Sequence, residues 1–104
     1  MNVLQSKLSP KELKTWMDEK KSFRLIDVRE AEEWAHGFIP TAEWRPMSRF
    51  MEEGLKDLDQ EESLVIYCHH GIRSLYVQKF LQDHGFANTW NLTGGIDAWE
   101  RAGY

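Results

Sequence analysis

A single stretch decides the fold of this chain: Leu64-Val65-Ile66-Tyr67-Cys68-His69-His70-Gly71-Ile72-Arg73-Ser74. Residues 64–67 are apolar and rich in β-branched and aromatic side chains, which favours a buried strand. Residues 74–86 carry apolar side chains at helical spacing, which predicts an amphipathic helix. A strand that passes through a tight loop into a helix places Cys68 at the start of that helix.

Cys68 is the only cysteine of the chain, and its position has chemical consequences. The first N–H groups of a helix lack intrahelical acceptors and the helix dipole is positive there, so a thiolate is favoured. In such settings the pKa of a cysteine falls from about 8.5 to about 3.5–7.5. Gly71 permits a positive φ, which lets several N–H groups converge, and Arg73 adds positive charge. The loop therefore predicts an anion cradle with a nucleophilic sulfur at its floor.

Two other interpretations of this loop compete with catalysis. A cysteine at the end of an apolar strand is more often an inert buried residue, but the polar residues from His69 to Ser74 make a poor core. A metal site is suggested by the adjacent Cys68, His69 and His70. Structural zinc takes four ligands, and three consecutive residues cannot all face one ion without strain, so we expect no metal. His69 and His70 are expected to contribute N–H groups and partial positive charge to the rim.

Four motifs follow one another along the chain: Leu25-Ile26-Asp27-Val28-Arg29-Glu30 with Glu33-Trp34, Gly37-Phe38-Ile39-Pro40 with Ala42, Tyr67-Cys68 to Ser74, and Leu92-Thr93-Gly94-Gly95-Ile96-Asp97-Ala98-Trp99. Their order and spacing resemble a single rhodanese-like sulfurtransferase domain, and the resemblance covers nearly the whole chain. It implies an α/β fold with a small central parallel sheet of about five strands, flanked by helices on both faces. It also implies an active-site loop from Cys68 to Arg73.

The composition is that of a soluble globular protein. The 104 residues suffice for one domain, residues 1–104, and 41% of them are hydrophobic. There is no run of about 18 apolar residues and no apolar signal segment, so we expect a cytoplasmic protein that does not bind a membrane. One cysteine cannot form an internal disulfide, which fits a reducing compartment. The net charge of −4 argues against nucleic-acid binding.

The remaining elements are predicted from caps and periodicity. Ser9 and Pro10 begin a helix, and Glu12 is placed for a capping box. We also expect strands over residues 3–8, 23–28, 43–45 and 89–92, a short helix over 30–36, a short helix with an acidic connection over 47–58, and a final helix after residue 95. The glycines at 94 and 95 either allow close packing near the active loop or form a plain turn.

Asp27 and Arg29 are further candidates because they follow the second strand. Ligands of parallel sheets bind at the carboxyl ends of strands, so one hypothesis has Asp27 facing the cysteine loop. The alternative is structural, and the resemblance implies it too. In that case Asp27 accepts hydrogen bonds from loop backbone, and Arg29 pairs with an acid such as Glu33.

The chain departs from the family pattern at four positions. The family usually has histidine where this chain has Phe38, glycine where it has Thr41, and small or aliphatic residues where it has Trp44 and Arg45. Trp44 and Arg45 raise the hypothesis of a mouth near the cysteine loop that selects the sulfur donor or acceptor. The alternative is a surface tryptophan and a solvated arginine.

The loop length indicates which chemistry to expect. Related phosphatases have five residues between cysteine and arginine, whereas this chain has only residues 69–72 between Cys68 and Arg73, followed by Ser74. The shorter loop suits a single sulfur atom. We therefore expect sulfur transfer, without cofactor or metal, from a small anionic donor such as thiosulfate or a persulfide to a thiol, cyanide or a sulfur-carrier protein. The alternatives are a persulfide carrier or docking module, a phosphatase, a catalytically silent relative and a redox-sensing cysteine.

Overall fold

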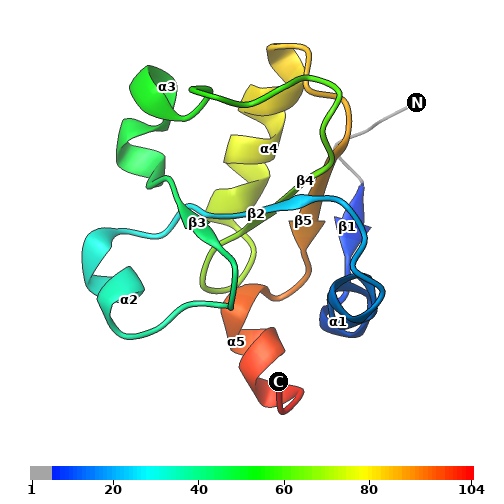
Figure 1. Cartoon of the computed structure of the whole chain (residues 1–104). Helices are drawn as coiled ribbons and strands as arrows, with labels where there is room; N and C mark the ends of the chain where they lie inside the picture. Colours follow the sequence, from blue (N-terminus) through cyan, green and yellow to red (C-terminus); the bar gives the residue numbers. More distant parts are fainter. Residues whose placement is uncertain (1–5) are drawn as a thin grey trace.

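The computed structural model describes residues 6–104 and contains a five-stranded parallel sheet. The strands are β1 (Lys7–Leu8), β2 (Arg24–Asp27), β3 (Glu43–Trp44), β4 (Leu64–Tyr67) and β5 (Thr89–Leu92). They lie in the order β1-β5-β4-β2-β3 in the middle of the molecule (Figure 1). β4 is therefore the central strand. The predicted first strand falls partly on residues 3–5, which lie outside the described residues.

Helices cover both faces of the sheet, as predicted. They are α1 (Pro10–Asp18), α2 (Ala31–Ala35), α3 (Phe50–Glu53), α4 (Arg73–Asp83) and α5 (Gly95–Arg101). α3 and α4 lie on one side of the sheet, and α1 and α5 lie on the other (Figure 1). The fold class predicted from the sequence is confirmed. No helix within residues 6–104 has the length and apolar character needed to cross a membrane.

Each face of the sheet buries its own hydrophobic cluster. Because side chains alternate along a strand, Val65 and Tyr67 join the cluster with α1 and α5, whereas Leu64, Ile66 and Cys68 join the cluster with α3 and α4. The residues of β4 are fully buried, and burial of each large aliphatic side chain contributes about 1.5–3 kcal/mol. This alternation fixes the face on which Cys68 lies.

The helix boundaries follow local capping. Glu12 N donates to Ser9 Oγ at 3.0 Å and Ser9 N donates to Glu12 Oε1 at 2.8 Å, so the predicted capping box is confirmed. α4 ends at Asp83, and Gly85, two residues further on, adopts a φ of +91° that ends the helix.

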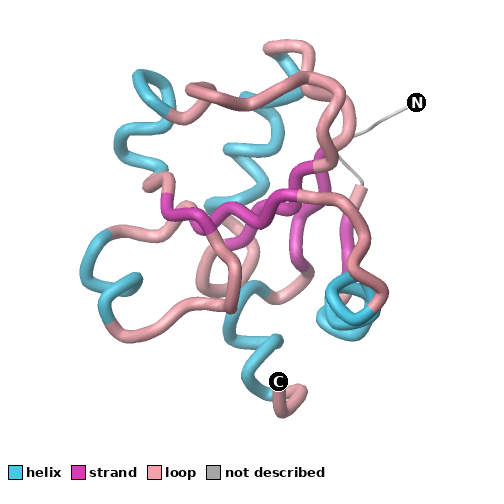
Figure 2. Tube along the Cα trace, viewed as in Figure 1, coloured by secondary structure: helices cyan, strands magenta, loops and turns pink. Residues whose placement is uncertain are grey.

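The predicted short helix and connection over residues 47–58 are confirmed. The chain forms a 3₁₀-helix, η2 (Met47–Arg49), and then α3, which Phe50 anchors in the core. After α3, residues 54–63 run to β4 through turns without a regular element (Figure 2).

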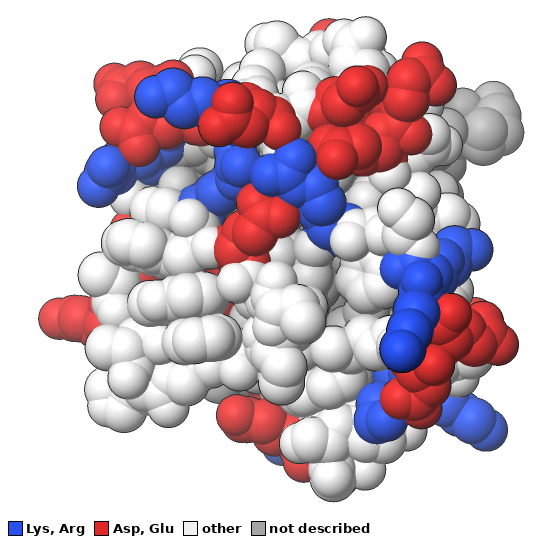
Figure 3. All heavy atoms as spheres, in the orientation of Figure 1, with Lys and Arg blue, Asp and Glu red and all other residues white. Residues whose placement is uncertain are grey.

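Charged side chains of both signs gather in a band over α3 and the connection that follows it, as the space-filling view shows (Figure 3). Arg24 of β2 belongs to this band and pairs with Glu43 at 2.8 Å and with Glu62 at 3.1 Å. The hydrogen bonds from Arg24 hold the pKa of Glu43 below its usual range. The area of the same face over α2 is largely uncharged (Figure 3).

Candidate functional site

Cys68 follows β4 directly, at the carboxyl end of the central strand. It faces α4, and only 1% of the residue is exposed to solvent. The loop from Cys68 to Ile72 connects β4 to α4, which begins at Arg73. The predicted arrangement of a cysteine below a strand-to-helix loop is therefore present, and the sulfur is almost fully enclosed by the protein.

The loop directs hydrogen-bond donors at the sulfur. Gly71 N donates to Cys68 Sγ at 3.1 Å, and Ser74 Oγ lies 3.4 Å from Sγ. Gly71 has a φ of +103°, which only glycine adopts readily, so the prediction of a positive φ at this position is confirmed.

The pKa of Cys68 reflects two opposing influences. Burial is the larger single influence and by itself raises the pKa of the thiol. Hydrogen bonds from Ser74 Oγ and from the backbone N–H groups of Ser74, Gly71 and His70 together outweigh burial, so the pKa of Cys68 lies below its usual value. The site thus favours the thiolate, which is the nucleophilic form of cysteine.

The N-terminus of α5 holds the other side of the loop. Ile96 N donates to the carbonyl oxygen of Cys68 at 2.9 Å, and Asp97 N donates to that of His69 at 3.1 Å. Gly95 makes this approach possible, because a Cβ atom on it would overlap both of these carbonyl oxygens. Of the two interpretations of residues 94 and 95, the structure supports close packing against the active loop.

Arg73 is paired with Glu33 of α2. Its Nη1 and Nη2 donate to the two carboxylate oxygens at 2.8 and 2.7 Å, a bidentate arrangement. These hydrogen bonds lower the pKa of Glu33 to about 2. Arg73 is still close enough to Cys68 for the two charges to interact. The expected positive charge is therefore present beside the sulfur, but a carboxylate balances it.

Asp27 and Arg29 form a buried ion pair with each other. Arg29 Nη2 donates to Asp27 Oδ2 at 2.8 Å and also to the carbonyl of Gly37 at 2.7 Å. Arg29 thus pairs with an acid, as expected, but that acid is Asp27; Glu33, the example suggested from the sequence, is engaged by Arg73. Asp27 accepts from Arg29 N at 2.9 Å, which agrees with the structural interpretation of this carboxylate.

Tyr67 extends this buried network toward the chain that precedes β3. Its hydroxyl oxygen accepts from Ile39 N at 3.1 Å and bonds to Asp27. Burial and the nearby Asp27 charge raise the pKa of Tyr67 well above its usual value, so the hydroxyl stays protonated. The network holds together the segments around the carboxyl end of β2.

Arg45 lies against the turn that follows α3. β3 is an edge strand separated from β4 by β2, and Arg45, which directly follows β3, donates to the carbonyls of Gly54 at 3.0 Å and Lys56 at 2.5 Å. It lines a cavity of about 320 Å³ to which residues 68–74 do not contribute. In this structure the Arg45 side chain closes the turn after α3, and its part in a donor-selecting mouth stays a hypothesis.

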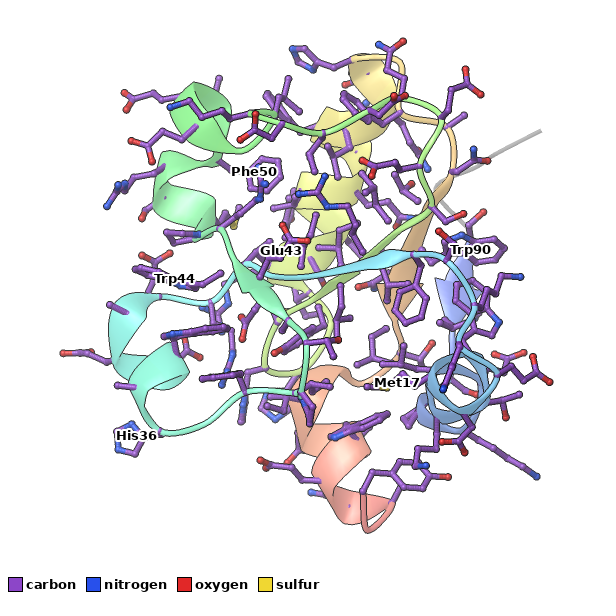
Figure 4. The ribbon with its side chains drawn as sticks, in the orientation of Figure 1. Met17, His36, Glu43, Trp44, Phe50 and Trp90 are labelled. Atoms are coloured by element: carbon purple, nitrogen blue, oxygen red, sulfur yellow. The ribbon has the colours of Figure 1, made fainter. Side chains whose placement is uncertain are left out.

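Trp44 lies beside α2 (Figure 4). Its Nε1 donates to the carbonyl of Arg29 at 2.8 Å, and its ring stacks on Trp34 with centroids 6.1 Å apart. Phe38 also stacks on Trp34, with ring centroids 3.8 Å apart and an angle of 6° between the ring planes. The unusual Phe38 and Trp44 thus form one aromatic stack with Trp34, and neither is a hydrogen-bond partner of Cys68 or a member of its hydrophobic cluster among the described residues.

His69 and His70 lie at the rim of the loop, half-buried and exposed respectively. His70 Nε2 lies 3.9 Å from Asp97 Oδ2 of α5. Potential ligand atoms of His69, His70 and Asp97 lie within 4.8 Å of one another, and Cys68 is not part of this group. Asp97 is also bound by Arg101 at 3.0 Å. That the site works without a metal stays a prediction.

Sequence reasoning missed two residues of the site. Glu33 was not expected to hold Arg73, and Asn91 was not considered at all. Asn91 accepts from Ser74 Oγ and donates through Nδ2 to the carbonyl of Gly71 at 3.1 Å. The available signal was a polar residue within a strand beside the central one, on the face toward the helix that carries Ser74.

Comparisons with known proteins agree with this geometry. The chain matches the family described as Rhodanese-like domain over residues 9–102. It is 40% identical over 93 residues to the putative sulfurtransferase YtwF of Bacillus subtilis, which covers 89% of this chain and 88% of YtwF. It is 37% identical over 97 residues to the probable adenylyltransferase/sulfurtransferase MoeZ of Mycobacterium tuberculosis; the match covers 92% of this chain but only 25% of MoeZ. A crystal structure of a rhodanese-like domain protein from Staphylococcus aureus has a TM-score of 0.84 at 34% identity, covering 91% of both chains.

Proposed function

The chain belongs to the rhodanese-like domain family, and we propose that it is a sulfurtransferase that carries a sulfane sulfur on Cys68. The observation that carries this proposal is a buried sulfur that receives a backbone N–H at 3.1 Å inside a short loop. Such a loop stabilises a thiolate and leaves room for a narrow donor group. The putative sulfurtransferase YtwF, which matches nearly end to end, supports the same reaction class.

The first step is attack of the Cys68 thiolate on the sulfane sulfur of thiosulfate or of a persulfide. A new S–S bond forms to Cys68 while the S–S bond of the donor breaks, and sulfite or a thiolate leaves with the electron pair. Cys68 then carries a persulfide with its negative charge on the outer sulfur. No electron is lost overall, so no external oxidant or reductant is required.

The second step is attack of an acceptor on the outer sulfur. A thiolate acceptor becomes a persulfide and cyanide becomes thiocyanate, and Cys68 leaves as the thiolate. Backbone N–H groups of residues 69–74 stabilise the anionic sulfur in both steps, because they are oriented before the charge develops. The Arg73–Glu33 pair is nearly neutral, so these dipoles supply most of the stabilisation.

Intact-protein mass spectrometry after incubation with thiosulfate tests this proposal. We expect a gain of about 32 Da, one sulfur atom, which cyanide removes and which is absent from Cys68→Ser. Absence of the adduct with both thiosulfate and a small persulfide would refute the proposal and direct attention to phosphatase substrates.

A persulfide carrier is the second candidate, and the tight enclosure of Sγ favours it. A carrier accepts sulfur on Cys68 but returns it slowly to small acceptors, because a protein partner performs the second step. A stable persulfide on Cys68 that passes its sulfur to cyanide or glutathione only slowly, without repeated turnover, would indicate a carrier. Rapid multiple turnover would indicate an enzyme that acts on small molecules.

A further inference from the structure

A buried polar seam lies between α4 and β5. Ser74, Gln78 and Gln82 are four residues apart and so share one face of α4. Gln78 Nε2 donates to the carbonyl of Thr89 at 3.1 Å, and Gln82 Nε2 donates to Thr89 Oγ1 at 2.9 Å. Ser74 and Asn91 form the end of this seam next to Cys68.

The orientation of the Asn91 amide is fixed by its neighbours. Its Nδ2 donates to the carbonyl of Gly71, so its Oδ1 faces Ser74 Oγ. Turning the amide over would place two carbonyl oxygens together at Gly71 and leave both without a proton. Ser74 is fully buried and Asn91 is 6% exposed, so water does not replace these partners readily.

Asn91 Oδ1 and Cys68 Sγ compete for the single hydroxyl proton of Ser74. A serine hydroxyl has one proton to donate, and Asn91 Oδ1 receives it. Toward Cys68, 3.4 Å away, Ser74 then presents a lone pair, which suits a thiol that donates its own S–H. A thiolate has no proton, and it receives a hydrogen bond from the Ser74 hydroxyl, in addition to those from the backbone N–H groups, only if that hydroxyl turns from Asn91 to the sulfur. That turn leaves Asn91 Oδ1 buried without a donor.

We propose that Asn91 is a positioning residue for Cys68. Asn91 Oδ1 accepts the hydrogen bond of the Ser74 hydroxyl while Cys68 is a thiol, and the hydroxyl turns to donate to the sulfur when Cys68 ionises. The thiol proton goes to solvent in this step, and the hydroxyl rotates without any change in covalent bonds. When a persulfide forms, the charge moves to the outer sulfur and the hydroxyl returns to Asn91. The inference rests on the proposed function only in treating Cys68 as the reactive group.

Asn91 therefore opposes ionisation of Cys68, and this sets its effect apart from that of a residue that only supports the loop. Removing the amide oxygen leaves Ser74 free to donate to the thiolate, which lowers the pKa of Cys68. Loosening the loop would instead draw the Gly71 N–H away from Sγ and raise that pKa. The two roles predict shifts of opposite sign.

Other charged groups around the sulfur remain the same when Asn91 or Ser74 is changed. These groups are Arg73 of α4, which is paired with Glu33 of α2, the loop residues His69 and His70, and Asp97 of α5. A shift in the ionisation of Cys68 in an Asn91 variant is therefore assigned to the seam.

The test is the pH dependence of Cys68 alkylation by iodoacetamide in a double-mutant cycle of Asn91→Ala and Ser74→Ala. Asn91→Ala is expected to lower the apparent pKa of Cys68 by about 0.5–1 unit, and to give no downward shift when Ser74→Ala is already present. Asn91→Val keeps more bulk in the strand and gives the same expected shift, should the alanine variant fold poorly. Asn88→Ala, at an exposed asparagine before β5, is the matched control and leaves the pKa unchanged.

Three outcomes would overturn the inference: an upward shift, no shift, or a downward shift that persists in the Ser74→Ala background. Alkylation requires only a reactive thiol, so this result is independent of sulfur transfer. If the pKa of Cys68 shifts as expected but no persulfide adduct forms, the proposed function is refuted and the role of Asn91 is retained. If a persulfide adduct forms but the pKa of Cys68 does not shift as expected, the role of Asn91 is refuted and the proposed function is retained.

Discussion

Two helices begin beside the same loop, and the chain uses their N-termini differently. Neither helix has a side-chain N-cap. The first N–H groups of α5 donate to the carbonyls of Cys68 and His69, whereas the Ser74 N–H in the first turn of α4 donates to the cysteine sulfur. α5 therefore holds the carbonyl oxygens of the loop away from the sulfur. α4 keeps an N–H donor for the anionic sulfur. The N-terminus of α5 therefore supports the structure of the loop, whereas the N-terminus of α4 takes part in its chemistry.

Gly95→Ala disturbs the contact between the N-terminus of α5 and the loop, and has the largest expected effect. The new Cβ would overlap the carbonyls of Cys68 and His69, and Gly95 has a φ of +62°, which costs an alanine about 1–2 kcal/mol. We expect the free energy of unfolding to fall by about 2–4 kcal/mol and sulfur transfer to slow by about 100-fold, because the loop donors lose their alignment. Urea unfolding and thiosulfate-to-cyanide kinetics measure the two effects.

Gly103→Ala is the matched control for this variant. Gly103 also has a positive φ, +89°, but a Cβ atom on it would contact nothing within 4 Å. It therefore carries the conformational penalty alone, about 1 kcal/mol, and leaves transfer kinetics unchanged. Equal losses of activity in both variants would show that α5 does not control the loop.

The sequence was sufficient to predict the parts of this site that depend on neighbours along the chain. Tyr67, Cys68 and Gly71 belong to one strand-to-loop segment, so hydrophobic pattern and glycine chemistry predicted their positions. The Ser9 capping box was predicted for the same reason, since its two partners are three residues apart. Local interactions of this kind need no knowledge of the tertiary structure.

Long-range partners were harder to predict. Glu33 lies 40 residues from Arg73, and two arginines compete for two carboxylates at this end of the sheet. Sequence spacing favoured Arg29 with Glu33, but the buried Asp27 accepts from Arg29 and leaves Glu33 for Arg73. Such a choice depends on desolvation and on bidentate geometry, which only the folded arrangement determines.

Glu33→Gln sharpens the chemical half of the comparison by removing the charge that balances Arg73. The folded-state pKa of Glu33 is lowered from 4.5 to about 2, so the pair contributes stability above about pH 4.5 and loses it as the pH falls toward 2. About a third of each side chain is exposed, so after screening by solvent we expect a loss of only about 1–2 kcal/mol at pH 7.

Urea unfolding of the wild-type and Glu33→Gln proteins at pH 7, 4 and 3 measures this contribution. The difference in the free energy of unfolding should shrink between pH 4 and pH 3, because below about pH 4.5 the unfolded wild-type chain takes up a proton on Glu33 while the folded protein, in which the pKa of Glu33 is about 2, does not. Glu32→Gln, at an exposed neighbour in α2, serves as the control and should show no such trend. A difference that stays constant across this range would mean that the charge of Glu33 does not stabilise the fold.

Arg45→Ala tests a third helix end, the C-terminus of α3, where a side chain satisfies the backbone. Arg45 Nη1 donates to the carbonyls of Gly54 and Lys56, and the side chain is largely buried. We expect the free energy of unfolding to fall by about 1–2 kcal/mol, because the part-buried carbonyl of Gly54 and the exposed carbonyl of Lys56 lose a charged donor. Arg49→Ala removes only an exposed i,i+4 pair with Glu53, and its expected cost is about 0.3–0.5 kcal/mol.

Arg45→Ala should leave the thiosulfate kinetics unchanged. Arg45 bonds to the turn after α3, and β2 separates β3 from the strand that carries the cysteine loop, so its loss does not alter the donors around Sγ. A changed KM for thiosulfate with unchanged stability would support the hypothesis that Arg45 helps to select the donor. Lower stability with unchanged KM would place Arg45, like the N-terminus of α5, among the groups that hold the fold without touching the sulfur.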